Sequence, residues 1–232
     1  MTQTINTFAD RDIRQREIVP PEKLAACSSI VIGVGAIGRQ VAVQLTAVGV
    51  PRLTLIDFDT VGVENLAPQA YWPVDIGQPK VEATAALCRQ INPECEITPL
   101  NERFRRSMVK NLSALADTSV PPVVFACVDS IETRKLIWES LRGRCGLFVD
   151  GRMSAEVIRV LAADRPATDS YYATTLFTAA EAFVGSCTAK STVYTGCIAA
   201  GLMLSAFTRW LRALPVDRDI SLNLLAGEMV AR

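Results

Sequence analysis

The stretch Gly33-Val34-Gly35-Ala36-Ile37-Gly38 decides the fold of this chain. It ends a short apolar, β-branched run over Ser29–Val34, which predicts a buried strand, and it opens a helical segment over Ala36–Val48. In this context the first glycine permits a tight turn, the second lets the backbone approach a phosphate, and the third lets the helix pack on the strand. A glycine-rich turn without a ligand is the alternative.

The alternation of strand and helix continues along the chain. Further strands are predicted over Arg52–Ile56, Glu96–Leu100, Pro122–Val128 and Gly146–Val149, and further helices over Pro79–Ile91, Val109–Ala116, Ile131–Leu141 and Ile198–Leu211. Near the end, Ala155–Ala162 alternates apolar and polar residues as an antiparallel strand does, and Ile220–Leu225 predicts a last strand.

This order predicts an α/β fold, a Rossmann-like doubly wound mixed sheet with a parallel first half and antiparallel later strands. A length of 232 residues suits one domain. Residues 1–22 are polar and end in Pro20-Pro21, so we expect an N-terminal arm or short helix before a single domain over 23–232. The longest predicted loop covers 164–192, and loops of that length are usually functional or mobile.

Composition excludes several classes of protein. Lysine plus arginine equals aspartate plus glutamate at 24 each, so charge gives no argument for nucleic acid or a membrane surface. Neither a secretory signal nor a membrane span is predicted, and seven cysteines without a C-x-x-C pair fit a reducing cytoplasm. With no histidine in the chain, we expect neither a structural zinc site nor a histidine-dependent hydrolase.

Acidic and amide side chains follow the second predicted strand. Asp57 and Asp59 lie at its carboxyl end, where an acid normally takes ribose hydroxyls. One such acid with the glycines fits an NAD(P) oxidoreductase equally well. Asn65 and Gln69 then follow in a polar loop, and Lys80 stands at a helix start, where its ammonium could reach a phosphate. Taken alone, such a lysine is more often solvated.

Asp129 ends the strand over Pro122–Val128, and the carboxyl ends of parallel strands face the ligand crevice. A carboxylate there could hold Mg²⁺ against nucleotide phosphates. It could equally cap the helix that begins at Ile131, a role that Ser130 could share.

Together these residues resemble the ThiF/MoeB/ubiquitin-activating-enzyme superfamily. The resemblance runs from Arg11 to about Leu211. Its motifs are an arginine pair, the glycine run, an Asp-x-Asp, an Asn-Leu-x-x-Gln, a Gly-x-x-Lys and a Cys-x-Asp-x-x-x-x-Arg. Here they stand at Arg11–Gln15, Gly33–Gly38, Asp57–Val61, Asn65–Gln69, Gly77–Lys80 and Cys127–Arg134.

Members of this superfamily use ATP and Mg²⁺ to adenylate the C-terminal carboxylate of a ubiquitin-like protein. The resemblance implies that Asp59 binds ribose, that Lys80 and Asn65 contact phosphates, and that Asp129 is the magnesium-linked aspartate. It also implies that Arg14 reaches the triphosphate, in dimeric members from the partner subunit, so a homodimer is expected. The alternative for Arg14 is one more charge on a solvated arm.

Two departures from the family pattern stand out. The family usually has arginine just before Gln69, where this chain has Pro68, so one phosphate-binding charge is missing. Arg39, Arg103 or Arg152 could replace it. The paired Cys-x-x-Cys zinc motifs of many bacterial members are also absent.

A cysteine could accept the activated carboxylate. Cys187 ends the long predicted loop, where many relatives place a functional cysteine, and the nearby Lys190 would favour its thiolate. A packing role is the alternative. Cys127, Cys145 and Cys197 lie in apolar segments and are predicted to be small core residues.

The main hypothesis is adenylation of a ubiquitin-like protein with a flexible C-terminus, followed by a thioester on Cys187 for transfer to a conjugating enzyme. Adenylation of a sulfur-carrier protein in cofactor biosynthesis is an alternative, and a non-catalytic partner of an activating enzyme is another, which Pro68 favours. A peptide terminus or a tRNA nucleoside as substrate, and an NAD(P) oxidoreductase, are further alternatives.

Overall fold

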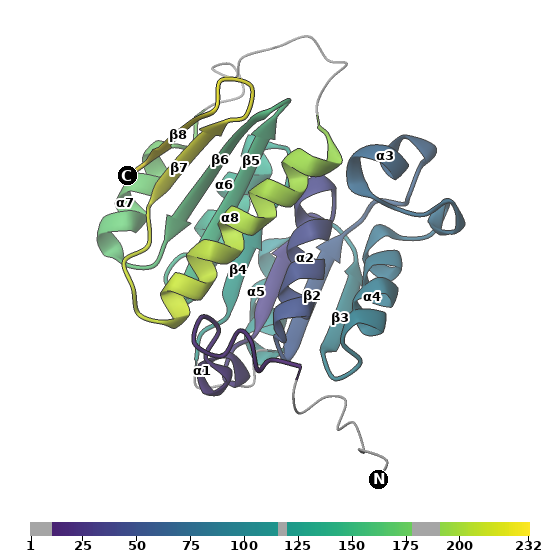
Figure 1. The fold of residues 1–232 in the computed structure, drawn as a ribbon, viewed down its shortest axis with the longest axis horizontal. Coiled ribbons are helices and arrows are strands. Elements are labelled where there is room, and N and C mark those ends of the chain that lie inside the picture. Colours follow the sequence, from purple (N-terminus) through teal and green to yellow (C-terminus); the bar gives the residue numbers. More distant parts are fainter. Residues whose placement is uncertain (1–10, 116–119, 178–190) are drawn as a thin grey trace.

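The computed structural model describes residues 11–115, 120–177 and 191–232. Within them the chain forms an eight-stranded sheet of order β3-β2-β1-β4-β5-β6-β7-β8 (Figure 1). The first five strands of this order, β3-β2-β1-β4-β5, pair in parallel with their neighbours. The strands β5, β6, β7 and β8 pair antiparallel. The predicted mixed sheet, with its parallel first half and antiparallel later strands, is therefore confirmed.

The elements follow the predicted alternation closely. The strands are β1 Ser29–Ile32, β2 Arg52–Asp57, β3 Glu96–Asn101, β4 Val123–Ala126, β5 Leu147–Ser154, β6 Val157–Ala163, β7 Asp219–Asn223 and β8 Glu228–Ala231. The α-helices are α1 Pro21–Ala25, α2 Ala36–Val48, α3 Leu66–Gln69, α4 Lys80–Ile91, α5 Val109–Leu115, α6 Ile131–Leu141, α7 Pro166–Thr174 and α8 Val193–Leu211. Short 3₁₀ turns lie at Val63–Asn65, Pro73–Asp75 and Arg106–Met108.

Helices cover both faces of the sheet. On one face α2, α4 and α8 pack over alternate strand residues such as Val31, Leu55 and Phe125. On the other face α5, α6 and α7 pack over the residues between them, such as Ile32 and Phe148. Burial on both faces explains why the central parallel strands β1 and β4 are apolar runs without alternation, whereas the edge strand β3 is largely polar. Figure 1 shows α2 and α8 side by side in front of the sheet.

The predicted loop over 164–192 is wrong in its first part, because α7 occupies Pro166–Thr174. This helix is rich in threonine and tyrosine and buries only a narrow strip, with Tyr172 at its centre, so its sequence carries no helical periodicity. The strand β8 was also not predicted. All its residues are exposed, so no buried apolar face marks it in the sequence.

The N-terminal arm packs against the C-terminal end of α2. Arg11 donates hydrogen bonds to the carbonyls of Thr46 (3.2 Å) and Ala47 (2.9 Å), and Gln15 donates to the carbonyl of Val48 (2.9 Å). These bonds satisfy carbonyls that the last turn of a helix leaves free. In the part of the chain that the structure describes, no helix is long and apolar enough to cross a membrane.

Candidate functional site

The glycine turn lies between β1 and α2, at the carboxyl edge of the parallel strands. Gly33 has a φ of +87°, and a Cβ there would lie 2.7 Å from the carbonyl oxygen of Cys127. A Cβ on Gly38 would lie 1.8 Å from the carbonyl oxygen of Gly33. Both positions therefore require glycine, the first for conformation and space and the second for the contact of helix with strand.

Gly35 has a different role, because its nearest neighbours would be 4.0 Å from an added Cβ. Those neighbours are the amide atoms of Gln69, whose Oε1 is buried without a hydrogen-bond partner among the described residues. The first turn of α2 receives no side-chain cap. The turn thus leaves space and free backbone amides at a helix N-terminus, the arrangement that binds phosphate.

The two aspartates after β2 make different contacts. The Asp57 carboxylate accepts hydrogen bonds from the backbone N–H of Val34 (2.6 Å) and of Asp59 (2.9 Å). It therefore holds the glycine turn against the end of β2. The Asp59 carboxylate instead accepts from the Lys80 ammonium at 3.1 Å. Ribose binding by Asp59 stays a prediction.

Lys80 opens α4, as the sequence indicated, but its side chain is only 8% exposed. The alternative of a solvated lysine is therefore wrong, and the Lys80 ammonium pairs with Asp59. Phosphate contact by Lys80 stays a prediction. Asn65 lies nearby in the chain and accepts a hydrogen bond from the Gly62 N–H through Oδ1 (2.9 Å). Its side-chain NH₂ makes no hydrogen bond to a described residue, and its phosphate contact stays a prediction.

Asp129 follows β4 at the same edge of the sheet. Its side chain is exposed and makes no hydrogen bond or ion pair to another described residue. Ser130 is the residue that caps α6, because its Oγ accepts from the Thr133 N–H at 3.2 Å. The alternative in which Asp129 caps the helix is therefore wrong, and its carboxylate is left available to a ligand.

The sheet order brings these residues together. Strands β1 and β4 are neighbours, and the chain leaves them toward opposite sides of the sheet. Ligands of open α/β sheets bind at such a switch point, outside the carboxyl ends of the strands. The glycine turn follows β1, Asp57 and Asp59 follow β2, and Asp129 follows β4, so all lie at this edge.

The structure removes two of the three arginines that could replace the charge missing at Pro68. Arg39 is 1% exposed, and it donates to Thr84 Oγ1 and the Ala70 carbonyl, both at 3.1 Å. Arg152 is held by Asp150 and by Thr175. Arg103 is exposed and stacks over the Phe58 ring at 3.8 Å, so it alone remains a candidate.

Sequence reasoning missed a buried ion cluster behind this edge. It consists of Arg134 from α6, Asp150 and Arg152 from β5, and Tyr172 from α7. The signal available was an aspartate and an arginine flanking Gly151 at the end of an apolar strand. Charges in that position are costly unless they are paired.

Arg14 lies far from the glycine turn of its own chain. It is exposed on the arm, and its neighbours Arg11 and Gln15 contact the C-terminal end of α2. The turn lies at the other end of this helix, whose 13 residues span about 20 Å. Arg14 therefore cannot reach the glycine turn of its own chain.

The described cysteines are poor nucleophiles. Burial raises the pKa of Cys27 to about 11 and the pKa values of Cys95, Cys127 and Cys145 to about 12. Burial also raises the pKa of Cys197, though that side chain is partly exposed. The packing role predicted for Cys127, Cys145 and Cys197 agrees with this. Cys187 lies outside the described residues.

We expect these thiols to resist modification in the folded protein. A pKa above the working pH lowers the thiolate fraction, which at pH 8 is about one in a thousand for Cys27 and lower for the other three. A disulfide reagent should therefore modify Cys27, Cys95, Cys127 and Cys145 only after unfolding in guanidinium chloride. Mass spectrometry of the Cys187→Ser variant measures this. Rapid labelling of any of the four in the native state would contradict it.

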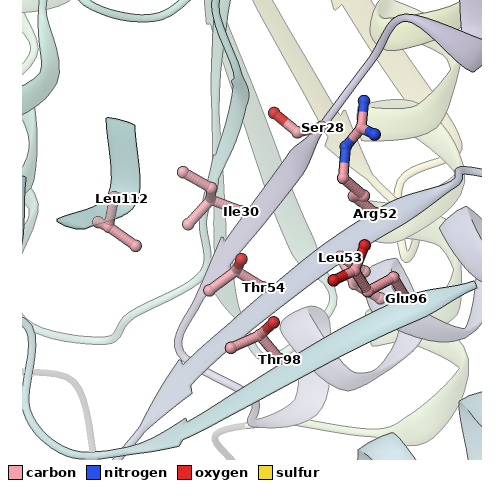
Figure 2. Close-up of a pocket in the computed structure, with 8 residues that line it drawn as sticks. All are labelled: Ser28, Ile30, Arg52, Leu53, Thr54, Glu96, Thr98 and Leu112. Atoms are coloured by element: carbon pink, nitrogen blue, oxygen red, sulfur yellow. The ribbon is translucent and has the colours of Figure 1, made fainter. Parts of the chain in front are cut away.

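One cavity of about 30 Å³ lies elsewhere, and Figure 2 shows its lining. It is at the amino ends of β1, β2 and β3, away from the glycine turn. The lining residues are Ser28, Ile30, Arg52, Leu53, Thr54, Glu96, Thr98 and Leu112. Its volume suits about one water molecule, far below that of a nucleotide site.

The residues at the carboxyl edge fit ATP with Mg²⁺. The open space at Gly35, the uncapped first turn of α2 and the buried Lys80 suit phosphates. Among the described residues no three acidic or cysteine side chains gather as a metal site. Proteins usually hold magnesium through one or two carboxylates and the substrate phosphates, and Asp129 has a carboxylate at this edge that could do so.

Comparison with curated proteins gives relatives of known class. The chain is 37% identical over 114 residues to the molybdopterin-synthase adenylyltransferase of Salmonella typhimurium, covering 49% of this chain and 44% of that one. It is 33% identical over 117 residues to the sulfur carrier protein ThiS adenylyltransferase of Escherichia coli, covering 50% and 45%. Each match thus spans less than half of the relative's length.

Comparison of the structure and of family models gives the wider assignment. The fold is similar to the crystal structure of PaaA, with a TM-score of 0.72 over 100% of this chain and 85% of that one. At 16% sequence identity this similarity concerns the fold alone. The model of the ThiF family matches residues 10–214, most of the 232-residue chain. The chain therefore belongs to the ThiF family.

Proposed function

We propose that this protein is an adenylyltransferase that uses ATP to activate the C-terminal carboxylate of a small carrier protein, releasing pyrophosphate. One observation carries the proposal. The glycine turn, the buried Lys80 and the unpaired Asp129 meet at one edge of the sheet, on either side of the β1–β4 switch point. In this proposal the ammonium and the backbone amides would bind the phosphates, and the nearby carboxylate of Asp129 would bind a metal ion.

The chemistry asks for this kind of site. A carboxylate that attacks the α-phosphorus is already ionised at pH 7, so no general base is needed, and the chain has no histidine to supply one. The difficulty is to bring two anions together in line. The amides of the glycine turn and Lys80 would hold the phosphates. Asp129 would hold Mg²⁺, whose positive charge offsets the negative charge of the phosphates.

The relatives favour a sulfur-carrier protein as the substrate. One of them is named for the adenylation of the sulfur carrier protein ThiS and another for that of molybdopterin synthase, and neither name mentions conjugation. The transfer of a thioester from Cys187 to a conjugating enzyme is a further step that adenylation alone does not require. ATP and Mg²⁺ as cofactors, and a carrier with a flexible C-terminus as partner, belong to both versions.

The test is ATP–pyrophosphate exchange with purified chain, Mg²⁺ and a small β-grasp carrier protein ending in glycine. We expect exchange that requires the free carboxylate of the carrier, and none with a carrier that lacks its last glycine. ATP binding without exchange would instead support a non-catalytic partner, the alternative that Pro68 favours. A thioester that forms in the wild type and is lost in Cys187→Ser would distinguish the conjugation version from simple adenylation.

We also propose that the enzyme acts as a homodimer, with Arg14 of each subunit serving the site of its partner. Arg14 cannot reach its own glycine turn, since the arm lies at the other end of α2. The outer surfaces of α2 and α8 offer the interface. The only charged residues of these adjoining helices are the buried Arg39 and, in the last turn of α8, Arg209. Such charge-poor helical faces suit subunit contact.

A mixing experiment tests this arrangement. Arg14→Ala and Asp129→Ala should each be inactive alone, but mixed dimers contain one site with neither substitution. Equal mixing with subunit exchange should therefore restore about one quarter of wild-type exchange activity. The same mixture kept from exchanging subunits is the control. No recovery after exchange, verified by mass spectrometry of the mixed dimers, would contradict action of Arg14 in the partner's site.

A further inference from the structure

A cluster of buried ionised side chains lies next to the loop that carries Asp129. Its centre is the carboxylate of Asp150, which is 0% exposed. This carboxylate accepts hydrogen bonds from Arg134 of α6, from Arg152 Nε at 2.8 Å and from the Tyr172 hydroxyl of α7 at 3.0 Å. A carboxylate so deeply buried is stable only when it is paired and hydrogen-bonded in this way.

Arg134 connects this cluster to the candidate site. Its guanidinium donates through Nη1 to Asp150 and to the carbonyl of Gly151 (3.1 Å), and through Nη2 to the carbonyl of Val128. Burial and the neighbouring Arg152 guanidinium lower the pKa of Arg134 to about 10, so it remains charged at pH 7. The guanidinium thus holds three acceptors from two nitrogens in a fixed planar fork, whereas an ammonium donates from a single nitrogen on a flexible stem.

The carbonyl that Arg134 holds belongs to the residue directly before Asp129. On the other side of Asp129, Ser130 is fixed as the cap of α6. The Asp129 side chain itself has no hydrogen bond to a described residue, so its carboxylate is directed by its backbone and by electrostatic attraction to the Arg134 guanidinium. We propose that Arg134, held by the buried carboxylate of Asp150, is the positioning residue for Asp129. The inference rests on the proposed function, in which Asp129 holds the metal ion.

The same carboxylate also serves a second segment. Arg152 binds Asp150 through Nε and donates through Nη1 and Nη2 to the carbonyl (2.9 Å) and the Oγ1 (3.0 Å) of Thr175. Thr175 is the C-cap of α7. Asp150 therefore links the loop of Asp129 to the end of α7, and a displacement of Arg134 need not leave the carboxylate unpaired.

Because Asp150 has other partners, Arg134 can be replaced without leaving a buried carboxylate unpaired. In Arg134→Gln, Asp150 keeps Arg152 and Tyr172 as partners, so we expect the chain to fold. We expect kcat for ATP–pyrophosphate exchange to fall about 10- to 100-fold, as for lost supports of metal-binding groups, while KM for ATP changes less than about threefold. Arg134→Lys keeps the charge but not the fork, and should give an intermediate kcat.

Arg159→Gln is the matched control. Arg159 of β6 pairs with Asp219 of the neighbouring strand β7 at 2.9 Å and makes no hydrogen bond to Val128 or Asp150. Its kcat should stay within about twofold of wild type. A wild-type kcat in Arg134→Gln, or a fall in kcat that only matches the loss of folded protein measured by circular dichroism, would overturn the proposal.

Amide hydrogen exchange gives a readout that does not need the adenylation activity. A peptide covering residues 127–131 should exchange at least about fivefold faster in Arg134→Gln than in wild type or Arg159→Gln, because the loop has lost its support. Equal exchange in all three proteins would overturn the positioning role. If the wild type shows no pyrophosphate exchange but this difference is found, the proposed function fails and the positioning of Asp129 stands.

Discussion

Replacement of Asp129 by alanine is expected to lower carrier-dependent ATP–pyrophosphate exchange by about 1,000-fold, the effect of losing a principal electrostatic group in a site of this kind. The free energy of unfolding should change by no more than about 0.5 kcal/mol, because the side chain is exposed and makes no hydrogen bond or ion pair to a described residue. Initial rates of ATP–pyrophosphate exchange measure the first effect, and urea unfolding measures the second.

Two further variants sharpen this expectation. Asp129→Asn keeps the size of the side chain and removes its charge, so a loss equal to that of alanine would assign the effect to the charge. Glu132→Ala removes an exposed carboxylate from the first turn of α6, three residues further on, and should stay within about twofold of wild type. Full activity in Asp129→Ala would rule out the proposed role of this residue.

Gly38→Ala is expected to destabilise the protein by about 3 kcal/mol or more, the upper range for overpacking in a close-packed interior. The added Cβ would lie 1.8 Å from the Gly33 carbonyl oxygen and 3.1 Å from the Cys127 Cβ, so α2 must move away from β1. Since α2 also packs on α4 and α8, the strain spreads into the core of that face. Denaturant unfolding measures the loss.

Gly35→Ala is the matched comparison, because its Cβ would have no neighbour closer than 4.0 Å. We expect a change in unfolding free energy below about 1 kcal/mol, since φ at Gly35 is negative and open to alanine. The same methyl group would enter the space left for phosphate, so ATP should bind about tenfold or more weakly by calorimetry. Equal destabilisation by both substitutions would contradict the division of roles between these two glycines.

Much of the fold was predictable because its signals are local. The runs that form β1, β4 and the middle of β2 are buried on both faces and so are largely apolar, and α2 was predicted with its observed bounds. The elements that were missed lack such signals. Helix α7 buries a narrow strip around Tyr172, and β8 buries nothing, so neither has the periodicity on which the prediction depends.

The site divides in the same way. The sequence by itself determined which residues stand at the ends of strands: the glycines after β1, Asp57 and Asp59 after β2, and Asp129 after β4. Parallel strands put all of their carboxyl ends at one edge, so strand prediction already gathers these groups. It also determined that glycine was required in the turn, because that need follows from the local change from strand to helix.

Only the tertiary structure decided which charged residues are buried and form ion pairs or hydrogen bonds within the protein. Arg39 had seemed available for phosphates, but it is buried between α2 and α4. Arg134 and Asp150 are 16 residues apart and meet because β4 and β5 are neighbours in the sheet. Such partners are chosen by strand order and by the cost of an unpaired buried charge. The motif spacing marks Arg134, and the charges around Gly151 mark Asp150, but strand order and burial are not local properties. Only the tertiary structure therefore shows that the two residues pair and lie behind Asp129.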